Sequence, residues 1–241
     1  MPDRLPNIDF HSHILPRTDH GCSCSSQAKA QLLMMRDAGT DIAVATPHFY
    51  PHVHNISEFE ELVDSALLRL GQLDIQKAPL LCVGAEVLLC ENMHQLDCLG
   101  KLCIRGTNVL FLELPTEDLN IGYYKTVEAI MEAGYTVVLA HIDRYLKKNS
   151  NFVCSILNDG ALAQINPYAL SMLGPKKRIN SILSETESIV AIGSDLHGAN
   201  AHALDDFLKF KKRLGNNYAE INARANKLLE NAELIDFTKK D

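Results

Sequence analysis

The chain alternates between short apolar runs and longer stretches in which apolar residues recur every three to four positions. The short runs are rich in Val and Ile and are typical of buried strands. We predict seven strands, at Asn7–Phe10, Ile42–Ala45, Leu80–Val83, Val109–Leu112, Thr136–Ala140, Ala163–Ile165 and Ile189–Ile192. The amphipathic stretches predict helices. These are expected at Ser25–Ala38, Ser57–Leu73, Ile121–Ala133, Phe152–Asn158, Pro175–Glu187, Ala203–Leu214 and Tyr218–Glu230.

Residues at the ends of these stretches support the boundaries. Ser57 is placed to cap its helix. Gly39, Gly134 and Gly215 each follow a helical stretch, where glycine commonly ends a helix. The strict alternation of strand and helix predicts parallel strands joined by helical crossovers. We expect a single α/β domain over residues 1–241, in which seven strands favour a barrel and leave an open sheet as the alternative.

Charge and hydropathy exclude several classes of protein. The 241 residues include 23 Lys plus Arg and 30 Asp plus Glu, giving a formal net charge of −7. An acidic chain is poorly suited to binding nucleic acid through phosphate contacts. No apolar stretch approaches the roughly 18 residues of a membrane span, and the first residues lack the apolar region of a signal peptide. We therefore expect a cytoplasmic protein that is not inserted in a membrane.

The seven cysteines do not indicate a disulfide framework, because their number is odd and their spacing irregular. Cys22 and Cys24 are a redox or metal pair or two ordinary loop thiols, and we favour the second interpretation. No cysteine is followed six positions later by arginine. The phosphate-binding loop of cysteine-dependent tyrosine phosphatases is therefore absent.

Histidine and carboxylate residues cluster directly after six of the predicted strands. They are His11, His13, Asp19, His20, His48, Glu86, Glu113, His141, Asp195 and His197. In a parallel α/β barrel the carboxyl ends of the strands converge on one face. Imidazoles mixed with carboxylates suit manganese, iron or zinc. Each residue alone is explained as a buried polar pair, a helix cap or a turn, but their joint placement predicts a multinuclear metal site.

Two arginines are candidates for binding an anionic substrate. Arg144 comes three residues after His141, and its guanidinium either binds phosphate or forms a salt bridge with a nearby carboxylate. Arg17 is a weaker second candidate. His52 and His54 lie in the loop after the second strand, where they border the site or are simply solvated.

Taken together, these motifs resemble the PHP superfamily of metal-dependent phosphoesterases. More narrowly, they resemble the bacterial capsule-type protein-tyrosine phosphatases, which act on autophosphorylated bacterial tyrosine kinases. The resemblance covers nearly the whole chain. Its motifs are Ile8-Asp-Phe-His11-Ser-His13-Ile-Leu-Pro, Ala45-Thr-Pro-His48, Gly84-Ala-Glu86, Glu113-Leu-Pro, Ala140-His141-x-x-Arg144-Tyr145 and Ser194-Asp195-x-His197.

The resemblance implies a distorted (β/α)7 barrel with three divalent metal ions, usually manganese, with iron or zinc as alternatives. Matched by motif, the first metal would be held by His11, His13, Glu86 and Asp195. The second would share Glu86 and add Glu113 and His141. The third would use His48, His197 and His20. At this last position the chain departs from the family, which usually has Asp-Asp-Gly where this sequence has Asp19-His20-Gly21.

The implied activity is hydrolysis of phosphotyrosine in a protein, with an autophosphorylated bacterial tyrosine kinase of capsule or exopolysaccharide regulation as the expected partner. Arg144 would stabilise the phosphate, and either His197 or Asp19 would be the catalytic acid. One alternative is a small-molecule phosphatase acting on a substrate such as histidinol phosphate. Another is a catalytically silent metal-binding module that interacts with a kinase.

Overall fold

All seven predicted strands are present in the structure, a computed structural model that describes residues 4–116 and 119–239. Three further strands, β3, β5 and β10, are only two or three residues long. The described strands are β1 (Ile8–His13), β2 (Ile42–Ala45), β3 (His48–Phe49), β4 (Leu80–Val83), β5 (Glu86–Leu88), β6 (Val109–Glu113), β7 (Thr136–Leu139), β8 (Leu162–Ile165), β9 (Ile189–Ile192) and β10 (Leu196–His197).

The predicted helices are also present, with ends that shift by a few residues. They are α1 (Ser25–Asp37), α2 (Ile56–Gly71), α3 (Ile121–Glu132), α4 (Ser150–Asn158), α5 (Lys176–Glu185), α6 (Ala201–Leu214) and α7 (Asn216–Leu228). The predicted cap of α2 was wrong. Asn55 caps this helix, because its side chain accepts hydrogen bonds from the backbone N–H groups of Ser57 and Glu58.

Every pairing between these strands is parallel, as predicted. The strands form two sheets, with the orders β10-β1-β2-β4 and β3-β5-β6-β7-β8-β9. Consecutive short segments, such as β2 and β3 or β4 and β5, therefore pair in different sheets. Pro47 separates the first pair and has no N–H to donate to a ladder. Gly84 separates the second, where a Cβ would lie 3.2 Å from the Ile104 Cα. The expected barrel is thus distorted into two sheets and does not close as one hydrogen-bonded ring.

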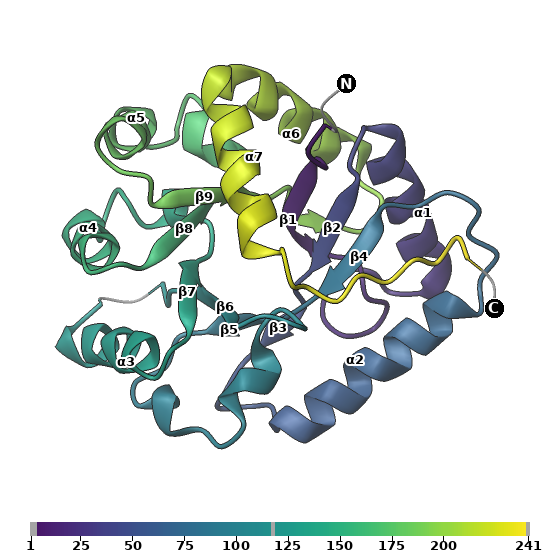
Figure 1. The fold of residues 1–241 in the computed structure, drawn as a ribbon, viewed down its shortest axis with the longest axis horizontal. Coiled ribbons are helices and arrows are strands. Elements are labelled where there is room, and N and C mark those ends of the chain that lie inside the picture. The colour runs from purple at the N-terminus through teal and green to yellow at the C-terminus, as the bar shows by residue number, and fades with distance from the viewer. Residues whose placement is uncertain (1–3, 117–118, 240–241) are drawn as a thin grey trace.

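The strands lie in the middle of the molecule with helices around the outside (Figure 1). Between the sheets, one apolar cluster joins side chains of both, including Phe10, Val44 and Phe111. A larger cluster fills the layer between the strands and the helices.

Helix α7 contacts β9 and β1, and its Ala225 belongs to the inner cluster. The helix also forms hydrogen bonds to the starts of these two strands. Asn222 Oδ1 accepts from the Ile8 N–H, and Arg224 Nη1 donates to the Ile189 backbone oxygen.

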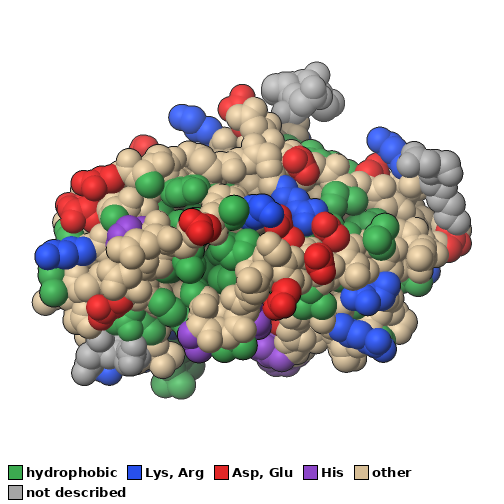
Figure 2. Space-filling model, turned by 90° about the horizontal axis from the view of Figure 1, so that it is seen from below, with side chains coloured by type: hydrophobic (Ala, Val, Ile, Leu, Met, Phe, Trp, Pro, Cys, Tyr) green, Lys and Arg blue, Asp and Glu red, His purple; other side chains and the backbone are tan. Residues whose placement is uncertain are grey.

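The surface is mixed in charge, and the cysteines are not bonded to one another. Acidic and basic side chains are interspersed over the face in Figure 2, and histidines gather at its lower edge. None of the seven cysteines forms a disulfide bond. Within residues 4–116 and 119–239, the helices are all too short or too polar to cross a membrane.

Candidate metal centre

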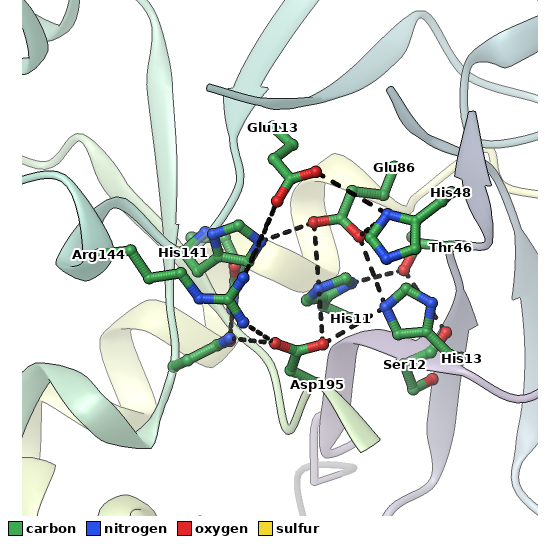
Figure 3. Close-up of polar contacts among 12 residues, drawn as sticks. His11, Ser12, His13, Thr46, His48, Glu86, Glu113, His141, Arg144 and Asp195 are labelled. Atoms are coloured by element: carbon green, nitrogen blue, oxygen red, sulfur yellow. Dashed lines mark hydrogen bonds and ion pairs between the residues drawn. The ribbon is translucent and has the colours of Figure 1, made fainter. Parts of the chain in front are cut away.

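Glu86, at the start of β5, is the carboxylate on which four imidazoles converge (Figure 3). Its Oε1 lies 2.6 Å from His141 Nε2 and 3.5 Å from His11 Nε2. Its Oε2 lies 3.0 Å from His48 Nδ1 and 3.5 Å from His13 Nε2. Glu86 is fully buried. One carboxylate therefore touches side chains from three other strand ends.

Asp195 closes the opposite side of the cluster. Its Oδ1 lies 3.3 Å from both His11 Nε2 and His13 Nε2. The predicted first strand stops at Phe10, but β1 continues to His13, because β10 pairs with its last residues.

Asp195 has a φ of 55° and His141 a φ of 29°, which is left-handed backbone that residues other than glycine seldom adopt. Such conformations concentrate at functional sites.

His197 and Glu113 complete the cluster from two further strands. The His197 ring stacks on His13 with centroids 3.9 Å apart, and its Nδ1 lies 3.0 Å from the Asp195 backbone oxygen. Glu113 Oε2 lies 3.9 Å from His48 Nδ1, and its Oε1 lies 3.8 Å from His141 Nε2. Both side chains are partly open to solvent. They therefore form the outer boundary of the cluster.

Eight of the nine predicted metal ligands fall into overlapping groups whose donor atoms lie within 4.8 Å of one another. The groups are His13, His48 and His197; His11, His13 and Asp195; His11, Glu86 and His141; and His48, Glu86 and Glu113. His20 belongs to none of these groups. Its ring is exposed and lies 4.9 Å from that of His48 and 4.5 Å from that of His197, between centroids. The structure thus places His20 at the rim of the cluster.

Several candidate ligand atoms in the cluster are buried without a hydrogen-bond partner. They are His11 Nε2, His13 Nε2, His48 Nδ1, Glu86 Oε2 and His197 Nε2. Even the 3.0 Å contact between His48 Nδ1 and Glu86 Oε2 is not aligned as a hydrogen bond. Unpartnered buried polar atoms are destabilising and rare in native proteins. Imidazole nitrogens and carboxylate oxygens are the ligands of zinc, iron and manganese ions. The residues present therefore fit divalent metals, which would satisfy these atoms.

Two histidines are held in orientation by hydrogen bonds on their other ring nitrogen. His11 Nδ1 lies 2.6 Å from Thr46 Oγ1, and His13 Nδ1 lies 2.6 Å from Asp19 Oδ2. Both rings therefore present Nε2 to the centre, which is the usual way in which metal-binding histidines are supported. Asp19 also accepts hydrogen bonds from the backbone N–H groups of Gly21 and His48. Burial alone would raise the pKa of Asp19, but these contacts hold it below its ordinary value.

Electrostatics keep the central carboxylates ionised despite their burial. Burial raises the pKa of Glu86 and of Asp195, but His11 and the other imidazoles lower both pKa values below the usual range. Burial and the charge of Glu86 raise the pKa of Glu113.

Burial lowers the pKa of His141 to about 4, so its imidazole is neutral and able to act as a ligand. Burial also acts to lower the pKa of His13, but contacts with Asp19 and Asp195 raise it to about 10, so this ring shares the charge of the cluster with the carboxylates. The ionised carboxylates would attract a divalent cation in place of that proton.

Arg144 lies at the edge of this cluster and is 46% exposed. Its Nη2 donates to Asp195 Oδ2, and its Nη1 lies 3.9 Å from Glu113 Oε1. The salt bridge considered from the sequence is therefore present. Because about half of the side chain remains open to solvent, the guanidinium is also accessible to an anion beside the cluster.

The remaining polar candidates lie outside the cluster. Arg17 is exposed, and its Nε donates to the Ser23 backbone oxygen. His54 Nδ1 accepts from the Tyr50 backbone N–H, and the Tyr50 ring stacks on that of His48 with centroids 5.4 Å apart. The loop with His52 and His54 therefore borders the cluster through Tyr50.

The sequence did not single out Gln164 or Asn166, which lie at the carboxyl end of β8. Gln164 Oε1 accepts from the His141 backbone N–H at 2.7 Å, and Asn166 Nδ2 donates to Asp195 Oδ2 at 3.1 Å. The candidate ligands predicted from the sequence are His, Asp and Glu residues, so neutral amides were not considered. Their position, within and directly after the one predicted strand that no ionisable candidate follows, was the available indication.

A family model described as capsular polysaccharide synthesis, CpsB/CapC, matches residues 7–233. The chain is similar in fold to a structure described as YwqE from Bacillus subtilis and CpsB from Streptococcus pneumoniae, unique metal-dependent tyrosine phosphatases. The TM-score is 0.75 and the identity 24%, over 94% of this chain and 95% of the other.

More distant folds are also similar. A β-aspartyl dipeptidase from Fervidobacterium islandicum has a TM-score of 0.52 and 11% identity, over 93% of this chain and 75% of the other. An inactive dihydroorotase-like domain from Chaetomium thermophilum has a TM-score of 0.53 and 10% identity, over 95% and 80%. No curated protein sequence matches the chain. Because the family model spans almost all of the described residues, the chain belongs to the CpsB/CapC family of capsular polysaccharide synthesis.

Proposed function

We propose that this protein is a metal-dependent phosphatase that hydrolyses phosphotyrosine in a protein of capsule or exopolysaccharide synthesis. The single observation that carries the proposal is the set of buried imidazole and carboxylate atoms that face one another without hydrogen-bond partners. Membership of the CpsB/CapC family and similarity in fold to a protein described as a metal-dependent tyrosine phosphatase support the same activity.

The proposed cofactor is three divalent metal ions, with manganese preferred over iron or zinc. His11, His13, Glu86 and Asp195 would hold the first. Glu86, Glu113 and His141 would hold the second. His48 and His197 would hold the third, with His20 next to them at the rim. Bound divalent metals supply a hydroxide near neutral pH and positive charge for the phosphoryl oxygens.

The protein side chains around the cluster would orient the substrate and the ligands. Arg144 would contact the phosphoryl oxygens with its exposed guanidinium, in a bidentate geometry that suits phosphate. Asp19 would hold His13 in orientation through its contact with the ring Nδ1. Its lowered pKa keeps the carboxylate ionised, so Asp19 has no proton to give to the leaving group. Burial lowers the pKa of His197, and its ring would hold the third metal, so neither residue is favoured as the acid. A phenolate has a pKa near 10 and needs less protonation than an alkoxide.

The substrate would be a phosphotyrosine side chain that protrudes into an open site. Tyr50, which is partly buried against His48, would contact the substrate ring. Contacts would be made mainly to the phosphate and the ring, so the sequence around the tyrosine would have modest influence. We infer that the partner is an autophosphorylated bacterial tyrosine kinase and that the reaction takes place in the cytoplasm.

Comparison of three phosphate esters tests this proposal. We expect the manganese-loaded protein to hydrolyse phosphotyrosine peptides with a higher kcat/KM than phosphoserine peptides or histidinol phosphate. Higher efficiency on histidinol phosphate would favour a small-molecule phosphatase and overturn the assignment of a protein substrate. Binding of metal and of a kinase without turnover of any of the esters would favour the interaction module.

A further inference from the structure

Two neutral amides occupy the place on β8 where other strands carry candidate metal ligands. Gln164 is fully buried, and Asn166 is 4% exposed. The groups of candidate metal ligands consist of imidazoles and carboxylates. Hydrogen bonds nevertheless join this pair to His141 on one side and to Asp195 on the other. The two amides therefore bridge two candidate ligands that come from different strands.

The backbone N–H of His141 fixes the orientation of both amides. Because this group is a donor, it requires an acceptor, which is Gln164 Oε1 at 2.7 Å. Gln164 consequently presents Nε2 to Asn166 and donates to its Oδ1 at 2.5 Å. Asn166 is left with Nδ2 facing Asp195, and donates to its Oδ2 at 3.1 Å. Each amide has one donor end and one acceptor end, so the orientation passes along the pair.

This orientation determines which oxygen of Asp195 faces the metal centre. Asp195 Oδ2 accepts hydrogen bonds from Asn166 and Arg144. Asp195 Oδ1 lies 3.3 Å from the Nε2 atoms of His11 and His13. A carboxylate held on one oxygen presents the other to a metal in a defined direction.

The surroundings of the pair prevent the amides from rotating freely. The Asn166 backbone N–H donates to Asp143 Oδ1 at 2.9 Å. Gln164 Nε2 also donates to the Ile165 backbone oxygen at 2.8 Å. At Gly193, a Cβ would lie only 2.6 Å from Gln164 Nε2, so the chain passes directly against the amide.

We propose that Gln164 and Asn166 form an amide relay that positions Asp195 Oδ1 for metal binding without contacting the metal. Both are positioning residues, since they act through His141 and Asp195. The proposal rests on the metal centre described under the proposed function, and it does not depend on the identity of the substrate.

Two nearly isosteric variants test the relay. Asn166→Asp removes the donor to Asp195, whereas Gln164→Glu keeps the acceptor for His141 and removes the donor to Asn166. We expect each to weaken manganese affinity by about ten- to hundredfold, measured by competition with a chelating dye. The visible absorption of the cobalt(II)-loaded protein should change in both. The manganese affinity of the double variant should be no lower than that of the single variant with the lower affinity. Both substitutions interrupt the same chain of hydrogen bonds from His141 to Asp195, so their effects should not add.

Asn222→Asp is the matched control. Asn222 is 7% exposed, and its Nδ2 donates to the Pro6 backbone oxygen at 2.9 Å, while its Oδ1 accepts from Ile8 at the start of β1. The control also replaces a buried amide with a carboxyl group. It should lower Tm and leave manganese affinity and the cobalt spectrum unchanged.

Wild-type affinity and spectrum in folded Gln164→Glu protein would overturn the relay, and so would strictly additive losses in the double variant. Circular dichroism establishes folding, and Gln164→Glu decides the question if Asn166→Asp does not fold. A wild-type protein that binds no divalent metal would overturn the metal centre and the relay together. If the wild type binds metal but does not hydrolyse phosphotyrosine peptides, the proposed activity fails, and the affinities of the variants still decide the relay.

Discussion

Single hydrogen bonds determine how the side chains of the candidate metal centre face one another. Thr46 and Asp19 hold the Nδ1 atoms of His11 and His13, so that both Nε2 atoms point inward. Supporting contacts of this kind fix the ring orientation of metal-binding histidines. His20 has a different environment, because its ring is exposed and stacks beside the cluster. The role of each ligand can therefore be tested by a single substitution.

His20→Ala tests whether the exposed ring contributes to metal binding. We expect the variant to bind less metal than the wild type, because His20 lies next to His48 and His197. His20→Asp should retain more of the bound metal, since a carboxylate can take the place of the imidazole. Metal content measured by mass spectrometry checks both. Wild-type metal content and rate in His20→Ala would show that His20 is only a neighbour of the site.

Arg144→Ala tests the contact proposed with phosphate. We expect kcat/KM to fall by about ten- to a thousandfold when manganese is present at a concentration that fills the sites, which corresponds to the loss of one charged contact. Arg144→Lys should recover part of the loss, because a point charge cannot reproduce a bidentate contact. Steady-state kinetics on a phosphotyrosine peptide measure the effect. Loss of metal in Arg144→Ala would instead assign the residue to its salt bridge with Asp195.

At the level of elements, the long apolar runs were predictable and the short strands were not. Strands β2, β4 and β9 match their predicted bounds, because each is a continuous apolar run between helices. Strands β3, β5 and β10 were missed. They have two or three residues and contain polar ligand candidates such as Glu86, so no apolar pattern marks them.

The cap of α2 is an example of local chemistry that the sequence left ambiguous. Asn55 and Ser57 both have suitable side chains, but only Asn55 has the extended backbone that directs its oxygen at the first turn. We expect Asn55→Ala to lower the free energy of unfolding by about 1 kcal/mol. Ser57→Ala should change it by less than about 0.5 kcal/mol. Urea denaturation measures both, and a larger loss in Ser57→Ala would contradict the assignment.

Gly193→Ala tests the close approach of β9 to the site. A Cβ would lie 2.6 Å from both Gln164 Nε2 and His11 Cβ, so the added methyl group must displace them. We expect a loss of about 1 to 3 kcal/mol in the free energy of unfolding, together with weaker metal binding.

Gly71→Ala is the control for Gly193→Ala, because nothing lies within 4 Å of a Cβ at the end of α2. It should leave metal affinity unchanged and not destabilise the protein. Equal effects of the two substitutions would show that the contact at Gly193 is unimportant.

For the whole molecule, the order of the motifs along the chain predicted the arrangement in space. Ligand candidates after successive strands meet because all strand pairings are parallel. The resemblance to the capsule-type family is confirmed by the family model. The division into two sheets was not predictable, because it arises from short breaks in the strands, such as that at Pro47. Gln164 and Asn166 were missed, because histidines and carboxylates were considered as candidate ligands and amides were not.

The central claim is that catalysis depends on metals held by this cluster. The most direct measurement is phosphotyrosine-peptide turnover by exhaustively chelated protein, before and after stoichiometric addition of manganese, with bound metal quantified in the same samples. Glu86→Gln is the matched variant, because Glu86 contacts four imidazoles.

We expect chelation to abolish turnover and manganese to restore it in the wild type. Glu86→Gln should neither bind the full complement of metal nor recover activity. Alkylation of the cysteine thiols should have little effect on a protein that stays folded, since no cysteine takes part in the proposed reaction. Full activity in metal-free wild-type protein would contradict the account.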